Sequence, residues 1–210
     1  MTTRKNIRTE QRNKLDFTAI EKFHPYKTFL FFALVGSSVL FIAFSSLYFF
    51  TVSRNAPPES FMLPKVFSVS TVLLLLSSFS ISRVTSAFRK DSFFDLKSSL
   101  YVTLALTFAF CLTQVLGWKK IFESGYFVSE HVGVAYLYVI SGIHFLHVLG
   151  GLIYLSVTAI QVHLKSRNIA SSLMFFADDY YLTKLQLTQY YWHFIDVLWI
   201  LLYFMFLFTF

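Results

Sequence analysis

Four ionisable side chains lie inside segments that are otherwise apolar, and these residues could do chemistry. Asp196 and His193 are three positions apart in the C-terminal apolar segment, and His144 and His147 are three positions apart in the segment before it. An aspartate in the middle of a membrane-spanning helix costs about 2.5–3.5 kcal/mol on insertion scales, so Asp196 is expected to face protein rather than lipid. A carboxylate near imidazoles can transfer protons, bind a metal or hold helices together through buried hydrogen bonds, and the pattern favours the last.

Both segments that carry these residues have a polar stripe at helical spacing. The C-terminal stripe consists of Gln189, His193, Asp196, Ile200 and Tyr203. The preceding stripe consists of Ser141, His144, His147, Gly151, Tyr154, Thr158 and Gln161. Because the two helices are expected to be antiparallel, we predict that His193 and Asp196 bind the face of His144 and His147. Gln114 and Tyr154 are expected as additional partners.

A haem held by histidines of facing helices, as in a stand-alone haem b membrane anchor, is an alternative. His144 and His147 cannot both be axial ligands of one haem from adjacent turns, so His193 would be the opposite ligand. The three histidines with Asp196 could also bind a metal, although the preceding segment has no carboxylate to complete the site. The single cysteine, Cys111, excludes an internal disulfide and metal sites built on clustered cysteines.

A proton-coupled transporter or channel is a further alternative, because intramembrane aspartate and histidine are typical of proton paths. Many transporters consist of two matching halves with helices broken by glycine or proline. The apolar segments here do not divide into two such halves. The prolines lie at segment edges, at Pro25, Pro57, Pro58 and Pro64. The pattern therefore argues against a transporter.

The composition is that of an integral membrane protein. Of the 210 residues, 56% are apolar and 14% are charged, which is about half the charged fraction of a soluble domain. The net charge of +7 does not indicate nucleic-acid binding, since the basic residues are spread over the connections between apolar segments. The first 26 residues are polar and basic and do not resemble a cleavable signal peptide, so we expect the first span to be an uncleaved anchor.

We predict an all-α fold, namely an integral membrane bundle of five transmembrane helices behind a basic cytoplasmic tail of residues 1–26. The single membrane domain is residues 27–210, with spans at about 27–50, 63–83, 97–117, 133–161 and 187–209. Of the 18 Lys and Arg residues, 14 lie on one side of the membrane, counted over the tail through Lys27, the second connection from Arg83 to Lys97 and the fourth connection. The positive-inside rule then places the N-terminus in the cytoplasm and the C-terminus outside.

Two motifs resemble those of the cytochrome c oxidase subunit III family. The last helix contains Tyr191-Trp192-His193-Phe194-Ile195-Asp196-Val197-Leu198-Trp199. The preceding helix contains Ser141-Gly142-Ile143-His144-Phe145-Leu146-His147-Val148-Leu149-Gly150-Gly151. Gln114 with Gly117-Trp118 and the serine-rich second span fit the same family in order. The resemblance covers nearly all of the chain after His24, and five spans match the short bacterial form of the family.

Within these motifs, several residues are expected to serve packing or interfaces rather than chemistry. They are Tyr191, Trp192, Phe194, Trp199, Gly142, Gly150 and Gly151. The sequence departs from the family at two acidic positions. Ser38 stands where the family often has a buried glutamate, and Gln186 stands where a glutamate commonly precedes the closing motif. A proton-relay role is therefore not assigned from the resemblance.

The resemblance implies an accessory subunit without a cofactor of its own, in a bacterial cytoplasmic (inner) membrane. In this family, subunit I holds the haems and the oxygen-reducing copper, while subunit III packs on its flank, binds phospholipid and sustains proton uptake for pumping. The implied partners are subunit I, subunit II, small subunits and membrane lipids, with no nucleic acid. A supercomplex with a quinol:cytochrome c oxidoreductase is a further possible assembly. A quinol oxidase or an accessory protein of nitric oxide reductase would fit the same motifs.

Overall fold

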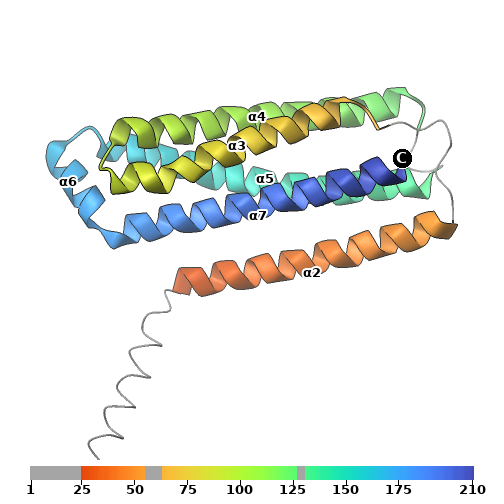
Figure 1. Ribbon diagram of the computed structural model, residues 1–210, viewed down its shortest axis with the longest axis horizontal. Helices are drawn as coiled ribbons and strands as arrows, with labels where there is room; N and C mark the ends of the chain where they lie inside the picture. Colours follow the sequence, from red (N-terminus) through yellow and green to blue (C-terminus); the bar gives the residue numbers. More distant parts are fainter. Residues whose placement is uncertain (1–24, 55–62, 127–130) are drawn as a thin grey trace, which may run out of the picture. The chain divides into compact units, whose positions relative to one another are not determined.

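The computed structural model describes residues 25–54, 63–126 and 131–210, and within these residues it contains helices and no strand. The helices are α2 (Pro25–Arg54), α3 (Val66–Arg89), α4 (Phe93–Glu123), α5 (Val132–Lys165), α6 (Ile169–Ala177) and α7 (Asp179–Thr209) (Figure 1). In this described part, five helices are long and apolar enough to cross a membrane, and the exception is the short α6. The predicted all-α fold with five spans is therefore confirmed. The predicted tail of residues 1–26 lies almost entirely outside the described residues.

The last connection differs from the prediction. The polar stretch before residue 187 was expected to be a loop, whereas the structure has α6 there and begins α7 at Asp179. Asp178 caps α7, because its carboxylate accepts a hydrogen bond of 2.9 Å from the backbone N–H of Tyr180. Leu185 in the added turns is buried against the bundle. Hydropathy marks only the apolar part of a helix, so it misses polar turns that extend beyond the hydrocarbon core.

The chain consists of two compact units, Met1–Val39 and Leu40–Phe210, and the boundary between them falls within α2. In the second unit, α3 packs against α4 and α7, and α5 packs against the same two helices (Figure 1). The tight turn between α3 and α4 uses Asp91 in the left-handed region, at φ 53°, which a short polar side chain tolerates better than most. Ser92 then caps α4 by accepting a hydrogen bond from the N–H of Asp95.

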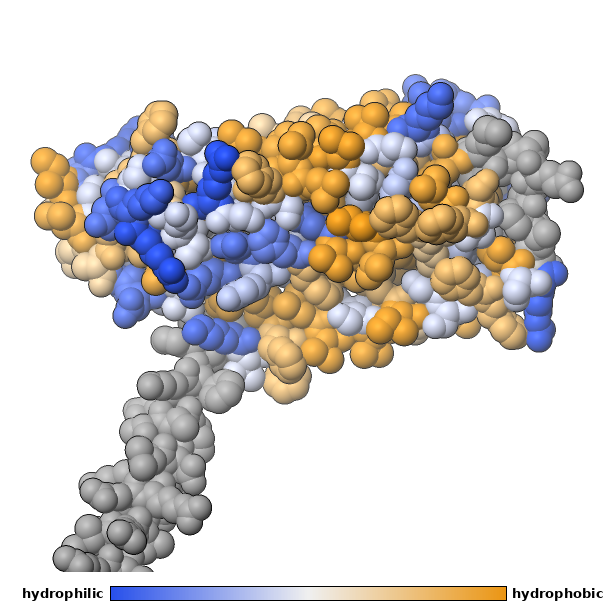
Figure 2. All heavy atoms as spheres, in the orientation of Figure 1, coloured by the Kyte–Doolittle hydropathy of each residue, from blue (hydrophilic) through white to orange (hydrophobic). Residues whose placement is uncertain are grey.

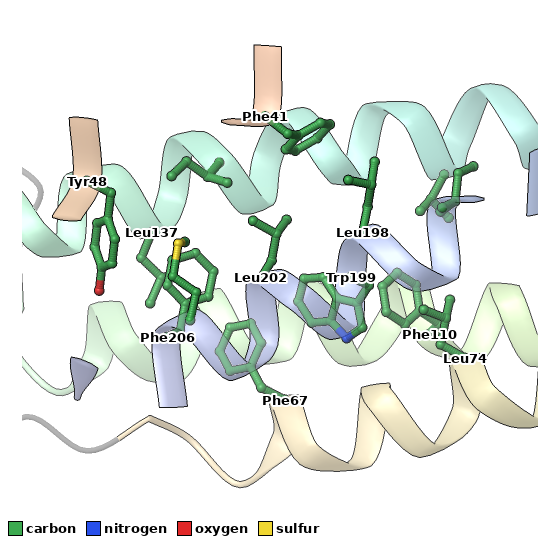
Figure 3. Close-up of a cluster of buried hydrophobic side chains, with 14 of the residues drawn as sticks. Phe41, Tyr48, Phe67, Leu74, Phe110, Leu137, Leu198, Trp199, Leu202 and Phe206 are labelled. Carbon is green, nitrogen blue, oxygen red and sulfur yellow. The ribbon is translucent and has the colours of Figure 1, made fainter. Parts of the chain in front are cut away.

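The core of this unit is rich in aromatic rings. Trp199 of α7 stacks on Phe67 of α3 at 6.2 Å between ring centroids and meets Phe110 of α4 edge-on at 5.4 Å (Figure 3). Phe41 and Tyr48, from the part of α2 in this unit, are buried in the same cluster. A second cluster at the α6 end joins Phe88, Phe175 and aliphatic residues of α3, α4 and α5. These two clusters fix the rotation of α7 about its axis.

The outer surface of the bundle is apolar along the helices and polar at their ends. Figure 2 shows hydrophobic residues over most of the visible face, with hydrophilic residues at both ends and a hydrophilic region that extends from one end toward the middle. In each spanning helix, no more than 44% of the residues in the most apolar stretch are buried inside the protein. A surface of this kind is what hydrocarbon or other membrane subunits would cover.

Candidate functional site

The predicted polar stripe of α7 faces α3 and forms a series of hydrogen bonds with it. We call this series the α3–α7 ladder. It consists of Ser68–Tyr203 (2.8 Å), Thr71–Trp199 (3.0 Å), Ser77–Trp192 (2.9 Å), Ser78–His193 (2.8 Å), Ser82–His193 (3.3 Å) and Thr85–Gln189 (2.6 Å). Residue numbers rise along α3 as they fall along α7, because the two helices are antiparallel. The stripe is therefore the face of α7 that packs against α3.

The predicted partner helix of His193 was wrong. Its Nδ1 lies 2.8 Å from the Ser78 hydroxyl oxygen and its Nε2 lies 3.3 Å from that of Ser82, so both ring nitrogens point to α3 rather than to α5. The physical reason is that α3 presents hydroxyls at helical spacing along the whole of α7. The α5 hydroxyls of Ser156 and Thr158 instead donate to carbonyls of their own helix.

Asp196 is the deepest charged residue of the stripe. Its side chain is 4% exposed, and within the described residues neither carboxylate oxygen has a hydrogen-bond partner. Its nearest ionisable neighbour is His193, with Nδ1 4.0 Å from Oδ2 and a side chain that is 36% exposed. Asp196 thus lies behind His193, with the Ser78 hydroxyl close to both residues.

His144 lies in an aromatic box. Its ring stacks on Trp199 at 5.1 Å with an interplanar angle of 29°, and Phe110 and Phe41 meet it edge-on at 6.2 and 6.4 Å. The residue is 1% exposed, and neither ring nitrogen has a hydrogen-bond partner among the described residues. His144 is therefore a packing residue of the α5–α7 interface in this structure.

His147, one turn further along α5, has different neighbours. Its Nδ1 lies 2.9 Å from the carbonyl oxygen of Ile143 in its own helix, and its ring packs against Phe41 at 5.6 Å. The Tyr191 hydroxyl donates to the His147 backbone oxygen at 3.0 Å. The three intramembrane histidines therefore have separate environments.

This separation bears on the haem and metal alternatives. His144 is enclosed by aromatic rings and His193 is bonded to α3, so the two are not arranged as an opposed axial pair. Across residues 25–54, 63–126 and 131–210, no group of three or more His, Cys, Asp or Glu side chains could hold a metal ion. The geometry of the described side chains favours neither alternative.

Gln114 and Tyr154, expected as further partners, have neighbours of their own. Gln114 of α4 is buried and donates from Nε2 to the Ser70 hydroxyl of α3 at 3.2 Å. Tyr154 of α5 is 42% exposed, and the Lys184 ammonium lies 5.5 Å from its ring centroid. Gln114 therefore joins α3 to α4, while Tyr154 lies at the polar end of α5 and α7.

The aromatic residues of the closing motif pack inside the bundle. Trp192 and Trp199 are buried, and each indole N–H donates to a hydroxyl of α3. Phe194 is partly buried against the aromatic core. The motif therefore uses its indole rings for both packing and hydrogen bonding.

The three glycines of the α5 motif differ in their surroundings. A Cβ atom on Gly151 would lie 2.9 Å from Cε1 of Tyr191 and 3.1 Å from Cζ3 of Trp192, so this glycine allows the close approach of α7. Cβ atoms on Gly142 or Gly150 would have nothing within 4 Å. Only Gly151 of the three is therefore needed for packing against the described residues.

The two positions where the family often has an acid are both polar here. The Ser38 hydroxyl donates to the Leu34 carbonyl in its own helix at 2.8 Å. Gln186 lines an open groove of about 340 Å³, which we call the α3–α7 groove. The groove is lined by Ser82, Thr85, Ser86, Arg89, Gln186, Gln189 and Tyr190.

Thr85 and Arg89 were not among the predicted site residues. A signal for the α3 side was present in the sequence, because Ser68, Thr71, Ser78, Ser82 and Thr85 recur at intervals that place them on one face of a helix. That face is the one that α7 contacts.

Comparison with known proteins identifies the family. Residues 28–209 match the family model described as cytochrome c oxidase subunit III. No individual curated protein matches the chain. The matched range covers the described spans apart from the first residues of α2 and agrees with the resemblance found in the α5 and α7 motifs. The chain therefore belongs to the cytochrome c oxidase subunit III family, as a multi-pass membrane protein that associates with other haem-copper oxidase subunits.

Proposed function

We propose that this chain is the accessory subunit III of an aerobic haem-copper terminal oxidase, without a redox centre of its own. In this role it stabilises catalytic subunit I and supports sustained proton uptake and pumping during oxygen reduction. The observation that carries the proposal is the family match over residues 28–209. The haems and copper would belong to partner subunits.

The environments of the histidines support this proposal. His144 is packed among aromatic rings, His147 bonds to its own helix, and His193 bonds to serine hydroxyls. Each imidazole therefore has a structural role that accounts for its place in the membrane without a haem. We infer that these side chains hold the bundle together.

The surface of the bundle supports the proposed partners. Long apolar residues on the outer faces of all the spanning helices are exposed, for example Leu146 of α5 at 65% and Leu201 of α7 at 62%. Subunit I, subunit II, small subunits and phospholipid would cover such faces. A supercomplex with a quinol:cytochrome c oxidoreductase would add a further neighbour.

The charged ends of the helices support an orientation in the bacterial cytoplasmic membrane. Arg89 and Lys90 lie at the turn between α3 and α4, and Lys165 ends α5 at the same end of the bundle (Figure 1). By the positive-inside rule this end faces the cytoplasm. The N-terminus is then cytoplasmic and Phe210 lies outside.

The test is affinity purification of the tagged full-length chain in a gentle detergent, followed by identification of the proteins that copurify. We expect oxidase subunits I and II, and the subunit II type distinguishes a cytochrome c oxidase from a quinol oxidase. A tagged, unrelated five-span protein from the same membrane is the control. Recovery of the chain without any haem-copper oxidase or nitric oxide reductase subunit would overturn the proposal.

A further inference from the structure

A buried carboxylate and a polar groove lie on opposite sides of the His193 ring, between α3 and α7. Asp196 is on the inner side, and the α3–α7 groove, open beside Arg89 and Gln186, is on the outer side. The ten residues from Gln186 to Asp196 correspond to about 15 Å along a helix, or about half of the hydrocarbon thickness. A buried acid at this depth is a candidate proton site only if something connects it to water.

His193 makes that connection. Two of the groove-lining residues, Ser82 and Gln189, contact its Nε2 at 3.3 and 3.5 Å. On the other side of the ring, Nδ1 lies 2.8 Å from Ser78 and 4.0 Å from the Asp196 carboxylate. One ring nitrogen therefore faces the groove, and the other faces the buried acid.

The contacts at the imidazole fit both of its neutral tautomers. The Ser82 hydroxyl donates its hydrogen to the Ser78 carbonyl at 2.8 Å, so at His193 Ser82 can only accept, which suits a hydrogen on Nε2 and an Nδ1 that accepts from the Ser78 hydroxyl. The Gln189 amide nitrogen, 3.5 Å from Nε2, can only donate, which suits a hydrogen on Nδ1 instead. In the Nε2–H tautomer nothing donates to Asp196 from the imidazole, and holding the carboxyl as a neutral acid avoids an unpaired buried charge.

We propose that Asp196 is a proton-binding site that exchanges protons with water in the α3–α7 groove through His193. On release, the Asp196 acid gives its proton to Nδ1, directly or through the Ser78 hydroxyl, and Nε2 gives its own proton to groove water. The products are the Asp196 carboxylate, the Nδ1–H tautomer and hydronium. Uptake is the reverse, so protons balance and no oxidant or reductant takes part.

The charged and titratable side chains on the helices that pack against α7 support a proton path through His193. At this level α3 presents hydroxyls, with Arg89 at the mouth of the groove, while Arg83 lines a separate groove against α4. On α5, His144 lies in its aromatic box and His147 bonds to Ile143, and α6 contains no titratable side chain. Within the described residues, His193 is thus the titratable group placed between Asp196 and the groove.

The test is infrared spectroscopy of native membranes or of the purified assembly, before and after exchange into D2O. A protonated buried carboxyl has a carbonyl band that shifts in D2O, and Asp196→Asn should remove the band that belongs to this residue. In the wild type we expect the band to shift within the time of the buffer change. In His193→Phe we expect exchange to be slower by about 100-fold or more, the lower end of what a positioned proton-transfer group contributes.

Thr71→Val is the matched control. It removes a hydroxyl from the same ladder, the acceptor of Trp199, but on the side of Asp196 away from the groove. Its exchange should be as fast as in the wild type. If His193→Phe does not accumulate in the membrane, Gln189→Leu is measured in its place. This variant changes the wall of the groove and removes the contact of Gln189 with His193, so its exchange should also be slower than in the wild type.

Two results would overturn the inference. One is that no carbonyl band is lost in Asp196→Asn, and the other is that exchange in His193→Phe equals that in Thr71→Val. Proton exchange at Asp196 rests on the proposed function only for the part that it would play in the oxidase. The band is measured on this chain whichever partners copurify, so failure of the partner purification and failure of proton exchange remain separate results.

Discussion

The two sides of α7 hold the helix in different ways. Toward α3 it is joined by hydrogen bonds: hydroxyls of α3 bond to Gln189 and His193, and the indole N–H groups of Trp192 and Trp199 donate to hydroxyls of α3. Toward α5 it is held by close packing at Gly151 and by the stacking of His144 on Trp199. Polar residues on a spanning helix therefore do not identify its hydrogen-bonding neighbour, because an imidazole can also serve as an aromatic packing ring.

Trp199 belongs to both sides, so its removal should have the largest effect. Trp199→Ala should lower the free energy of unfolding by about 3–5 kcal/mol, the usual cost of emptying a buried indole site. Unfolding in mixed detergent micelles would measure it. Phe208→Ala, at a ring that is 84% exposed on the same helix, should have little effect. Equal losses for the two variants would show that α7 does not pack as described.

The second prediction tests the close packing toward α5. Gly151→Leu should destabilise the bundle by about 1–3 kcal/mol, the usual cost of overpacking, because its Cβ would clash with Tyr191 and Trp192. Gly150→Leu is a matched control at the neighbouring position, where nothing lies within 4 Å. Thermal stability of both variants in detergent would compare them. A larger loss for Gly150→Leu would place the helix contact on the wrong face of α5.

The third prediction contrasts His193 with the buried His144. His193→Phe should cost about 0.6–1.7 kcal/mol, the range for side-chain hydrogen bonds between helices in membranes. His144→Phe should be neutral or slightly stabilising, because His144 has aromatic neighbours and unpartnered ring nitrogens among the described residues. Denaturant titration would give the free energy of unfolding of both variants. The opposite order would mean that His144 has a polar partner in the assembly.

The smallest expected effect is at a single hydroxyl. Ser78→Ala removes the hydroxyl that bonds to Nδ1 of His193 and should cost about 0.6 kcal/mol. Ser156→Ala of α5 removes a hydroxyl that donates to Leu152 in its own helix, and should cost less. Replicate unfolding curves resolve a difference of this size. Indistinguishable variants would indicate that the ladder contributes specificity rather than stability.

The sequence predicted the number of spans, because hydropathy encodes it directly, and it predicted the family, because the α5 and α7 motifs resemble those of that family. It did not predict α6 or the first turns of α7, since these polar turns lie beyond the apolar run. It also missed α3 as the partner of His193. Spacing within one helix shows which residues share a face, whereas the choice between neighbours depends on how α3, α4 and α5 pack around α7.

The aromatic box around His144 could not be predicted for a related reason. Phe41, Phe110 and Trp199 come from three different helices, and none is close to His144 in sequence. The groove at Gln186 likewise combines α3 and α7. Both features arise only when helices distant in sequence meet.

The account's central claim is that this subunit III contributes structure to an oxidase and leaves the redox centres to its partners. The most direct test is the reduced-minus-oxidised visible spectrum of the complex purified through the tagged chain, and of the chain after its partners are removed. We expect haem bands from the complex and none from the isolated chain. Haem bands that stay with the isolated chain would contradict the claim and restore a histidine-ligated haem within this bundle.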